Sequence, residues 1–143
     1  MRLKTYLEMR GADAGPWSRL CALPALWTGV FYDDAALAAA WDLCKHWTPE
    51  DRAGLRRDVP RLGLKAVVAG RTAQDVAKDF VAIARSGLKN RAHLNGGFLD
   101  ETIYLGDLEE IAETGITPAE RLLALYDGAW KGDIGRVFED FAY

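Results

Sequence analysis

A tyrosine, a glutamate and an arginine alternate near the N-terminus, within the segment Arg2–Trp17. Tyr6, Glu8 and Arg10 are each two residues apart, and side chains at that spacing leave the same face of a β-strand. A carboxylate and a guanidinium would then point together into the space above the strand. Because carboxylates bind metal ions and guanidinium groups bind anions, this spacing indicates a candidate binding or catalytic site.

The residues around this motif predict a strand that positions it. We expect the strand to run from about residue 3 to residue 10, with Leu7 and Met9 on its apolar face. Residues 11–16, GADAGP, should end the strand, since glycine, aspartate and proline favour turns. The motif also has a structural alternative, in which Glu8 and Arg10 only neutralise one another on an exposed strand.

Length and composition limit the class of protein. The chain has 143 residues, of which 50% are hydrophobic and 27% are charged, and this fits a single domain that buries a core. The net charge of -3 and the scattered Lys and Arg argue against nucleic-acid binding. No apolar run approaches the roughly 20 residues that span a bilayer, and the first residues do not form a signal peptide. We therefore expect a cytoplasmic protein that binds neither nucleic acid nor membranes.

The two cysteines, Cys21 and Cys44, do not form a disulfide framework. Neither belongs to a CxxC motif, and His46 has no second His or Cys at the spacing of zinc ligands. We expect both cysteines to be small buried thiols. A zinc site and a Cys/His nucleophile are both improbable from this pattern.

Downstream of residue 16 the sequence predicts a mainly α fold with about six helices and no large sheet. Leu20, Leu23, Trp27 and Phe31 recur at helical spacing and indicate a buried face, although Pro24 predicts a kink or a fresh helix start. A second stripe is expected at Leu37, Trp41 and Cys44. The later helices are expected at residues 35–47, 49–59, 73–87, 101–114, 118–127 and 134–143.

Capping residues define several of these helix boundaries. Asp33, Thr48, Thr72 and Thr117 each precede a helical pattern, and prolines follow two of the threonines at the first helical position. Pro60 and Gly87 should each end a helix. Residues 61–70 fit either a short strand or a loop. Residues 89–100 fit a solvated loop better than a ligand clamp.

Four segments of the chain resemble the C-terminal part of the glutamate-cysteine ligases of the plant and proteobacterial type. The most specific is YLEMRGAD followed by GPW and LCALPALW. The full segments are TYLEMRGADAGPWSRLCALPALWTGVFYD at 5–33, VPRLGLK at 59–65, GITPAERLLALYDGAW at 115–130 and VFEDFAY at 137–143. The resemblance implies that residues 1–143 form one domain, the C-terminal portion of an α+β carboxylate-amine ligase fold of the glutamine synthetase-like type. In that fold a curved antiparallel sheet holds the substrates on its concave face.

The resemblance also implies a reaction. Enzymes of this family join the γ-carboxyl of glutamate to the amine of cysteine, using ATP and Mg²⁺, in the first step of glutathione biosynthesis. In related bacterial ligases a strand motif Tyr-x-Glu-x-Arg supplies a metal-binding Glu and a phosphate-binding Arg, and Tyr6, Glu8 and Arg10 match it. The resemblance therefore implies that Glu8 binds Mg²⁺ and that Arg10 is a catalytic residue that also binds ATP.

One departure from the family bears directly on function. A full ligase is much longer, and most of its glutamate pocket, nucleotide site and other magnesium ligands would lie upstream of the segment seen here. The chain contains no Walker-type phosphate loop. We expect it to be inactive or nearly inactive alone, and to act with the missing N-terminal catalytic portion or to self-associate. The alternative is a noncatalytic helical module that keeps the ligase scaffold in order to bind a partner. The sequence does not distinguish a natural truncation from a separate subunit or a fragment.

Overall fold

The computed structural model describes residues 2–3, 5–8, 12, 15–91 and 100–142. These residues form seven α-helices and four strands of two residues each. The strands pair into two small hairpins and no larger sheet forms among the described residues. The prediction of a mainly helical fold is therefore confirmed.

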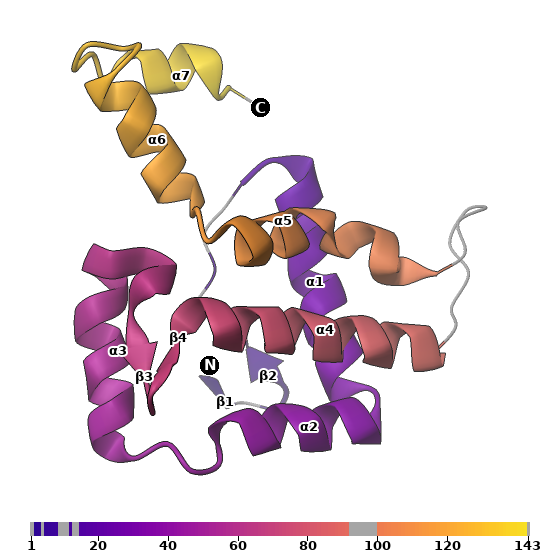
Figure 1. The fold of residues 1–143 in the computed structure, drawn as a ribbon. Coiled ribbons are helices and arrows are strands. Elements are labelled where there is room, and N and C mark those ends of the chain that lie inside the picture. The colour runs from indigo at the N-terminus through magenta and orange to yellow at the C-terminus, as the bar shows by residue number, and fades with distance from the viewer. Residues whose placement is uncertain (1, 4, 9–11, 13–14, 92–99, 143) are drawn as a thin grey trace.

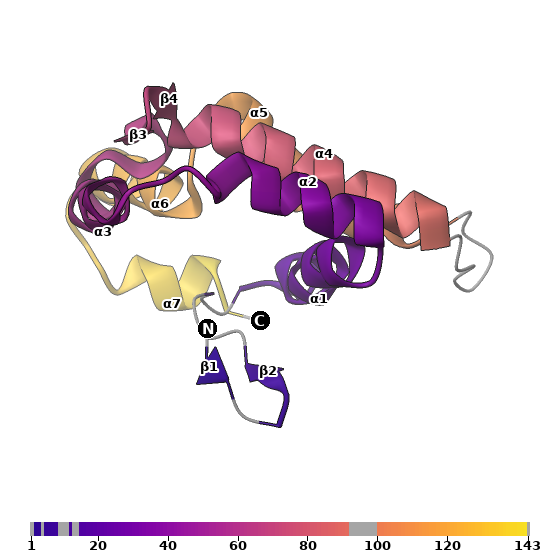
Figure 2. The ribbon, with the colours of Figure 1, turned by 90° about the horizontal axis from the view of Figure 1, so that it is seen from below.

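Helix α4 (Ala73–Arg91) is the centre of the fold, and three other helices pack against it. Helix α1 (Trp17–Phe31) crosses one side of α4, while α2 (Asp34–Cys44) and α5 (Gly106–Thr114) flank it (Figures 1 and 2). A 3-10 turn, η2 (Glu101–Leu105), leads into α5 and contacts both α1 and α4. Helices α1, α2 and α5 and the turn η2 thus form one helical body around α4.

Helices α1 and α4 approach each other through glycines. A Cβ atom added at Gly29 would lie 2.2 Å from the carbonyl oxygen of Ala84, and one added at Gly87 would lie 1.8 Å from the carbonyl oxygen of Gly29. No side chain fits at these distances unless the backbones move apart. The prediction that Gly87 ends the helix is wrong, because Gly87 is a packing residue within a helix that continues to Arg91.

The buried residues of α1 and α2 are mostly small. Side chains that are at most 9% exposed in these helices are those of Ala22, Ala25, Val30, Ala36 and Ala40. Short side chains leave little volume between neighbouring helices, and close packing preserves dispersion contacts along both backbones. The core is therefore built from closely spaced backbones more than from bulky side chains.

The larger apolar residues of the same helices are only partly buried. Trp27 stacks on Phe31 with ring centroids 5.3 Å apart, and its edge meets Phe80 of α4 at 5.5 Å. In contrast, Leu20 is 48% exposed and Trp41 is 63% exposed. The aromatic pair of the predicted α1 stripe is therefore partly buried, and the predicted burial is wrong for Leu20, for Trp41 and for Leu37, which is 42% exposed.

The N-terminal segment forms a hairpin in place of one continuous strand. Strands β1 (Arg2–Leu3) and β2 (Leu7–Glu8) are antiparallel, with Arg2 opposite Glu8 and a bend at residues 5–6 between them. Folding back lets the two short segments satisfy each other's backbone groups, which a lone strand would leave unpaired. Figure 2 shows the hairpin projecting from the helical body on the side away from α4.

Two prolines lie inside helices instead of ending them. Helix α3 (Pro49–Leu62) continues through Pro60 to Gly63, whose φ of 55° is readily adopted by glycine, so the predicted stop before Pro60 is wrong. Pro60 lies in the last turn, where the loss of one N–H donor disrupts little of the helix. Helix α1 likewise runs unbroken past Pro24, and the predicted fresh start does not occur.

The threonine caps are confirmed. The hydroxyl oxygens of Thr48, Thr72 and Thr117 each accept a hydrogen bond from the backbone N–H three residues later. Asp33 caps α2 in the same way. Between α3 and α4 lie a 3-10 turn, η1 (Gly63–Lys65), and a hairpin of β3 (Val67–Val68) and β4 (Arg71–Thr72). The segment at residues 61–70, for which the sequence fitted either a short strand or a loop, thus contains a turn followed by a short strand.

Helices α6 (Pro118–Asp127) and α7 (Arg136–Asp140) project from the helical body, and we refer to residues 118–142 as the arm (Figure 1). The arm has a small core of its own. Trp130 is buried, its ring meets the ring of Phe141 edge-on at 6.0 Å, and its indole N–H donates to Asp140 Oδ2 at 2.8 Å. This contact joins the loop after α6 to the end of α7.

Candidate functional site

Glu8 lies at the end of β2 with its side chain half-buried. Tyr6 lies in the bend before β2 and is 59% exposed, so it does not share a continuous strand with Glu8. Arg10 lies outside the described residues. The structure therefore places the predicted metal ligand on the hairpin, while its pairing with Arg10 stays a prediction.

The start of α1 connects the hairpin segment to the helical body. The hydroxyl of Ser18 donates to Asp107 Oδ2 at 2.7 Å, and Arg19 Nε lies 4.0 Å from the same oxygen. Asp107 belongs to the first turn of α5, where the positive end of the helix dipole favours a carboxylate. One carboxylate thus fixes the beginning of α1, directly after the predicted motif, against α5.

Carboxylates are the side chains by which this chain could bind magnesium. Magnesium commonly takes one or two protein carboxylates and completes its shell with phosphate oxygens and water. The chemistry of Glu8 therefore fits a single magnesium ligand. No group of three or more His, Cys, Asp or Glu side chains converges in the part of the chain that the structure describes.

Both cysteines are free thiols, and both are half-buried, where the sequence predicted buried thiols. The thiol of Cys44 lies 3.6 Å from the carbonyl oxygen of Ala40 in the preceding turn of its helix. Cys21 lines a hollow of about 200 Å³ together with Glu101 and Tyr104. His46 is exposed just after α2.

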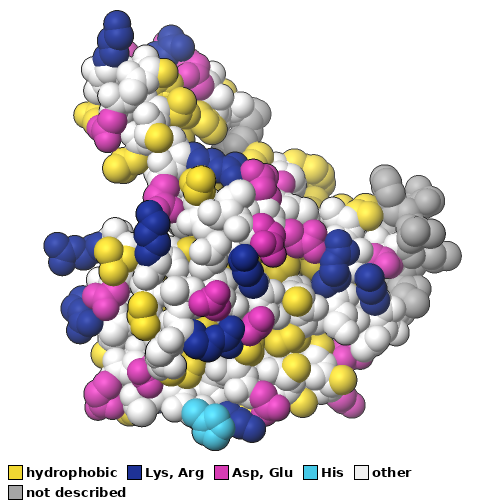
Figure 3. Space-filling view, in the orientation of Figure 1, with side chains coloured by type: hydrophobic (Ala, Val, Ile, Leu, Met, Phe, Trp, Pro, Cys, Tyr) yellow, Lys and Arg dark blue, Asp and Glu magenta, His cyan; other side chains and the backbone are white. Residues whose placement is uncertain are grey.

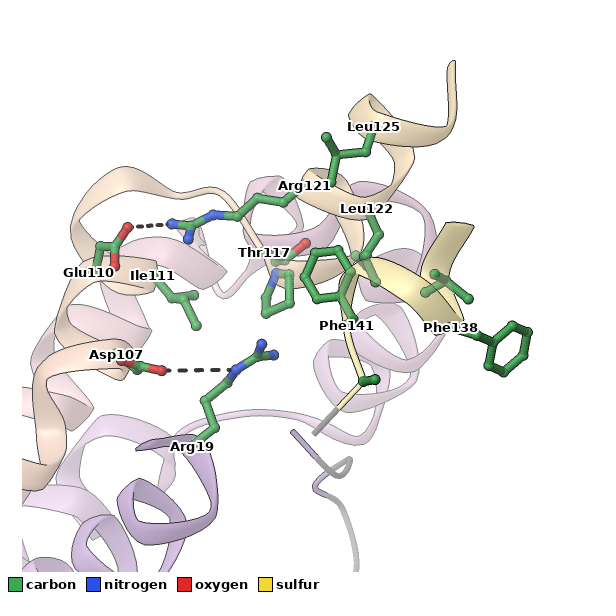
Figure 4. A pocket seen from close by; sticks show the side chains of 14 residues that line it. Arg19, Asp107, Glu110, Ile111, Thr117, Arg121, Leu122, Leu125, Phe138 and Phe141 are labelled. Carbon is green, nitrogen blue, oxygen red and sulfur yellow. Dashed lines mark hydrogen bonds and ion pairs between the residues drawn. The ribbon is translucent and has the colours of Figure 1, made fainter. Parts of the chain in front are cut away.

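Sequence reasoning missed a larger hollow, which we call the arm groove. It has a volume of about 1280 Å³ and lies between the arm, α5 and the start of α1 (Figure 4). Spacing along α6 and α7 contained a signal for it, because their apolar residues recur at helical intervals. The apolar lining residues are Ile111, Pro118, Ala119, Leu122, Leu125, Val137, Phe138, Phe141 and Ala142.

Charged residues fix the walls of the arm groove. Arg121 Nη2 of α6 lies 2.6 Å from Glu110 Oε1 of α5. At the start of α6, the backbone N–H of Thr117 donates to Glu120 at 2.8 Å, and this bond, with smaller contributions from the Thr117 hydroxyl and Lys65, lowers the pKa of Glu120. The first turn of α6 is therefore held both by its cap and by ion pairs to neighbouring elements.

None of the described helices is long and apolar enough to cross a membrane.

Comparison with known proteins identifies relatives of the whole chain. The model of glutamate-cysteine ligase family 2 (GCS2) matches residues 1–140. The chain is 47% identical over 143 residues to the chloroplastic glutamate-cysteine ligases of Arabidopsis thaliana and Nicotiana tabacum. It is 43% identical to chloroplastic glutamate-cysteine ligase A of Oryza sativa subsp. indica. All of this chain is covered in each case, but only 26%, 26% and 28% of the respective relatives. The chain thus spans about a quarter of the length of the curated relatives that it matches.

Proposed function

Because this chain belongs to glutamate-cysteine ligase family 2, we propose that it forms the C-terminal segment of a glutamate-cysteine ligase. The complete enzyme would join the γ-carboxyl of L-glutamate to the amine of L-cysteine at the expense of ATP, in the first step of glutathione biosynthesis. The observation that carries this proposal is the match of the entire chain, at 47% identity, to plant ligases.

Within that enzyme, Glu8 and Arg10 would act on the bound nucleotide. When bound, ATP and Mg²⁺ would supply the phosphoryl group that activates an otherwise unreactive carboxylate, and the amine would then displace phosphate from the phosphorylated carboxylate. Glu8 would contribute one oxygen ligand to Mg²⁺. Arg10 would hold the phosphoryl group through its planar guanidinium, which stays charged at every physiological pH. The half-buried position of Glu8 on a projecting hairpin supports the first role, and the sequence motif supports the second.

The remaining ligase portion would supply the rest of the active site. One observation supports this division. The plant relatives carry nearly three-quarters of their length outside the matching segment. We therefore propose that the chain is inactive alone and that it contributes the hairpin to a site shared with the remaining portion.

A noncatalytic interaction module is the second candidate. Its support is the number of large apolar side chains that are exposed away from the motif, including Trp17, Tyr32, Trp41 and Phe138. Exposed apolar surface of this kind often serves protein association. Both candidates require a partner, and they differ in whether Glu8 and Arg10 take part in a reaction.

A mixing experiment tests the proposed function. The remaining portion is prepared from the Arabidopsis thaliana relative by removing the segment that aligns with this chain. ATP-dependent formation of γ-glutamylcysteine is then measured for each piece and for the mixture. We expect product only from the mixture, and the control is the same mixture without ATP. A mixture that forms a stable complex but makes no product would favour the noncatalytic module.

We also propose a cytoplasmic location for this chain, on the composition of its sequence. The plant relatives are named as chloroplastic enzymes. Imaging of the chain fused to a fluorescent protein, in the cell that encodes it, tests this location. Signal confined to an organelle would contradict it.

A further inference from the structure

We propose that the arm groove is the docking site for an apolar segment of the remaining ligase portion. The inference rests on the proposed function, since the occupant is a part of the same ligase. The proposal assigns partner binding to a second surface of this chain, formed by α5, α6 and α7. This surface is separate from the predicted motif.

The size of the groove points to a polypeptide occupant. Its volume of about 1280 Å³ exceeds the range of roughly 300–1,000 Å³ typical of small-molecule pockets. An amphipathic helix laid into a groove between helices is a common mode of recognition between polypeptides. The arm groove is bounded by helices on several sides, and Figure 4 shows Leu122 and Phe141 facing the space between α5 and α7.

Contacts within this chain hold the walls of the groove. Arg121 and Glu110 join α6 to α5, and Lys65 Nζ lies 3.5 Å from Glu120 Oε1, which joins the start of α6 to η1. Each such exposed pair contributes little by itself. Together with the cap at Thr117 they set the direction in which α6 leaves the body. A preformed groove spares the partner much of the cost of ordering its binding site.

The chemistry of the lining favours an apolar occupant. Apolar side chains contributed by α5, α6 and α7 line most of the groove, and Phe138 at its edge is 79% exposed. In Figure 3 hydrophobic side chains gather on the projecting arm. The charged residues in the lining already form ion pairs with one another, as Arg19 does with Asp107, so they do not demand a charged partner.

The length of the relatives favours an occupant that belongs to the same polypeptide as the groove. In the plant ligases the segment that matches this chain is about a quarter of a single polypeptide. A groove and an occupant on one polypeptide meet at a high effective concentration, so an open groove of modest affinity would still be filled. A second copy of this chain has no such advantage at low concentration. We therefore assign the groove to the remaining ligase portion.

Two matched double variants test this assignment. Leu122→Ser with Phe138→Ser changes two residues that line the groove, one in α6 and one in α7. Leu123→Ser with Ile134→Ser changes two exposed apolar residues of the arm that are outside the lining. The dissociation constant of each full chain for the remaining portion of the Arabidopsis thaliana relative is measured by calorimetry, and circular dichroism checks that each variant folds.

We expect the groove variant to bind at least roughly tenfold more weakly than the original chain, because central apolar contacts dominate such interfaces, and the control variant to stay within about twofold. Equal effects of the two variants, or no binding by the original chain, would overturn the assignment.

Sedimentation tests the alternative occupant, a second copy of this chain. If only the groove variant loses a homodimer, and its affinity for the remaining portion is unchanged, the groove would instead be assigned to a second copy. Because affinity is measured separately from product formation, a pair that binds through the groove but makes no γ-glutamylcysteine would contradict the proposed function alone.

Discussion

The contact between α1 and α4 and the arm use opposite kinds of residue. Where α1 meets α4, Gly29, Gly87 and Ala84 bring two backbones so close that a single added Cβ atom would overlap a carbonyl oxygen. Along α6 and α7, large apolar residues that line the arm groove, such as Phe138, are exposed. The first region leaves no room for a side chain, and the second offers side chains with no neighbour to cover them among the described residues.

This difference separates residues that fold the chain from residues available to a partner. Burial stabilises a fold only where neighbouring atoms fill the space around it, and α1, α2, α4 and α5 achieve this mainly with small residues. Exposed Phe and Leu side chains contribute no such stabilisation to the isolated chain. The comparison predicts that changes in the α1–α4 contact alter stability, and that changes on the hairpin or in the lining of the arm groove alter activity or binding.

The largest effect is expected at Glu8. In the reconstituted pair, Glu8→Gln replaces a charged oxygen ligand with a neutral amide and should weaken magnesium binding. We expect turnover to fall by roughly 30- to 1,000-fold, which corresponds to about 2–4 kcal/mol of transition-state stabilisation. Added magnesium should restore part of the activity, and the melting temperature should stay within about 2 °C of the original. Turnover close to normal would show that Glu8 takes no part in the reaction.

Arg10→Lys should lose a similar share of turnover. Lysine keeps the charge but does not reproduce the planar pair of donors that guanidinium presents to a phosphoryl group. Extra magnesium should not rescue this variant, which distinguishes it from Glu8→Gln. Loss of activity that follows loss of the folded state in thermal melts would contradict a catalytic role.

Gly87→Ala tests the α1–α4 contact, which is the region that we compare with the arm. The new Cβ would lie 1.8 Å from the carbonyl oxygen of Gly29, so α1 and α4 must separate. Overpacking of this kind costs about 1–3 kcal/mol or more, against less than about 1 kcal/mol gained from the helix preference of alanine. We expect a net loss of about 2 kcal/mol in the free energy of unfolding, measured by urea denaturation.

The matched control for that variant is Gly54→Ala in α3. A Cβ at this position would meet only Arg57 Nη2, at 3.9 Å. Alanine should therefore stabilise the helix by about 0.5–1 kcal/mol. Destabilisation by both substitutions, or by neither, would show that the close α1–α4 contact is not what decides stability.

Thr117→Ala should have a smaller effect that is limited to the arm. It removes the hydroxyl that accepts from the backbone N–H of Glu120 at the start of α6. Loss of such a cap costs about 1 kcal/mol, and here the cost should appear as faster hydrogen exchange in α6. Exchange in α4 should not change. Equal acceleration in both helices would mean that the arm and the body unfold together.

The smallest effect is a pH dependence at Glu120. Its pKa is lowered below the ordinary value of 4.5, first by the backbone N–H of Thr117. A lowered pKa in the folded state means that the contribution to stability is present above the unfolded pKa and is lost as the pH falls through the folded pKa. An NMR titration of the Glu120 carboxyl should show a midpoint below 4.5 that rises in Thr117→Ala. An identical midpoint in the two proteins would contradict the role of the hydroxyl.

Local signals in the sequence predicted the helix starts well, and packing explains most of the errors. Thr48 and Thr117 carry their capping partners three residues away, so the start of each helix depends on nearby residues alone. Gly87 is different, because its role depends on Gly29, which is far away in sequence but adjacent in the fold. A glycine that permits close packing looks the same in sequence as a glycine that ends a helix.

The candidate site was predicted in part. Strand alternation placed Glu8 in an extended segment, and the structure has it in β2, but alternation could not reveal that residues 5–6 bend the chain into a hairpin. The arm groove is formed by residues between Arg19 and Ala142, which no local pattern brings together. Its apolar residues were read as ordinary helix positions, since a sequence does not show which apolar face lacks a neighbour.

Hydrogen–deuterium exchange of this chain, measured with and without the remaining ligase portion, tests most directly whether one region folds the chain and another binds the rest of the ligase. We predict that amides of residues 119–127 and 136–140 exchange more slowly in the mixture, because the occupied groove suppresses opening of the arm. Amides at residues 25–30 and 84–88, in the α1–α4 contact, should exchange at unchanged rates. Slower exchange only in the α1–α4 contact, or no change anywhere, would contradict the account.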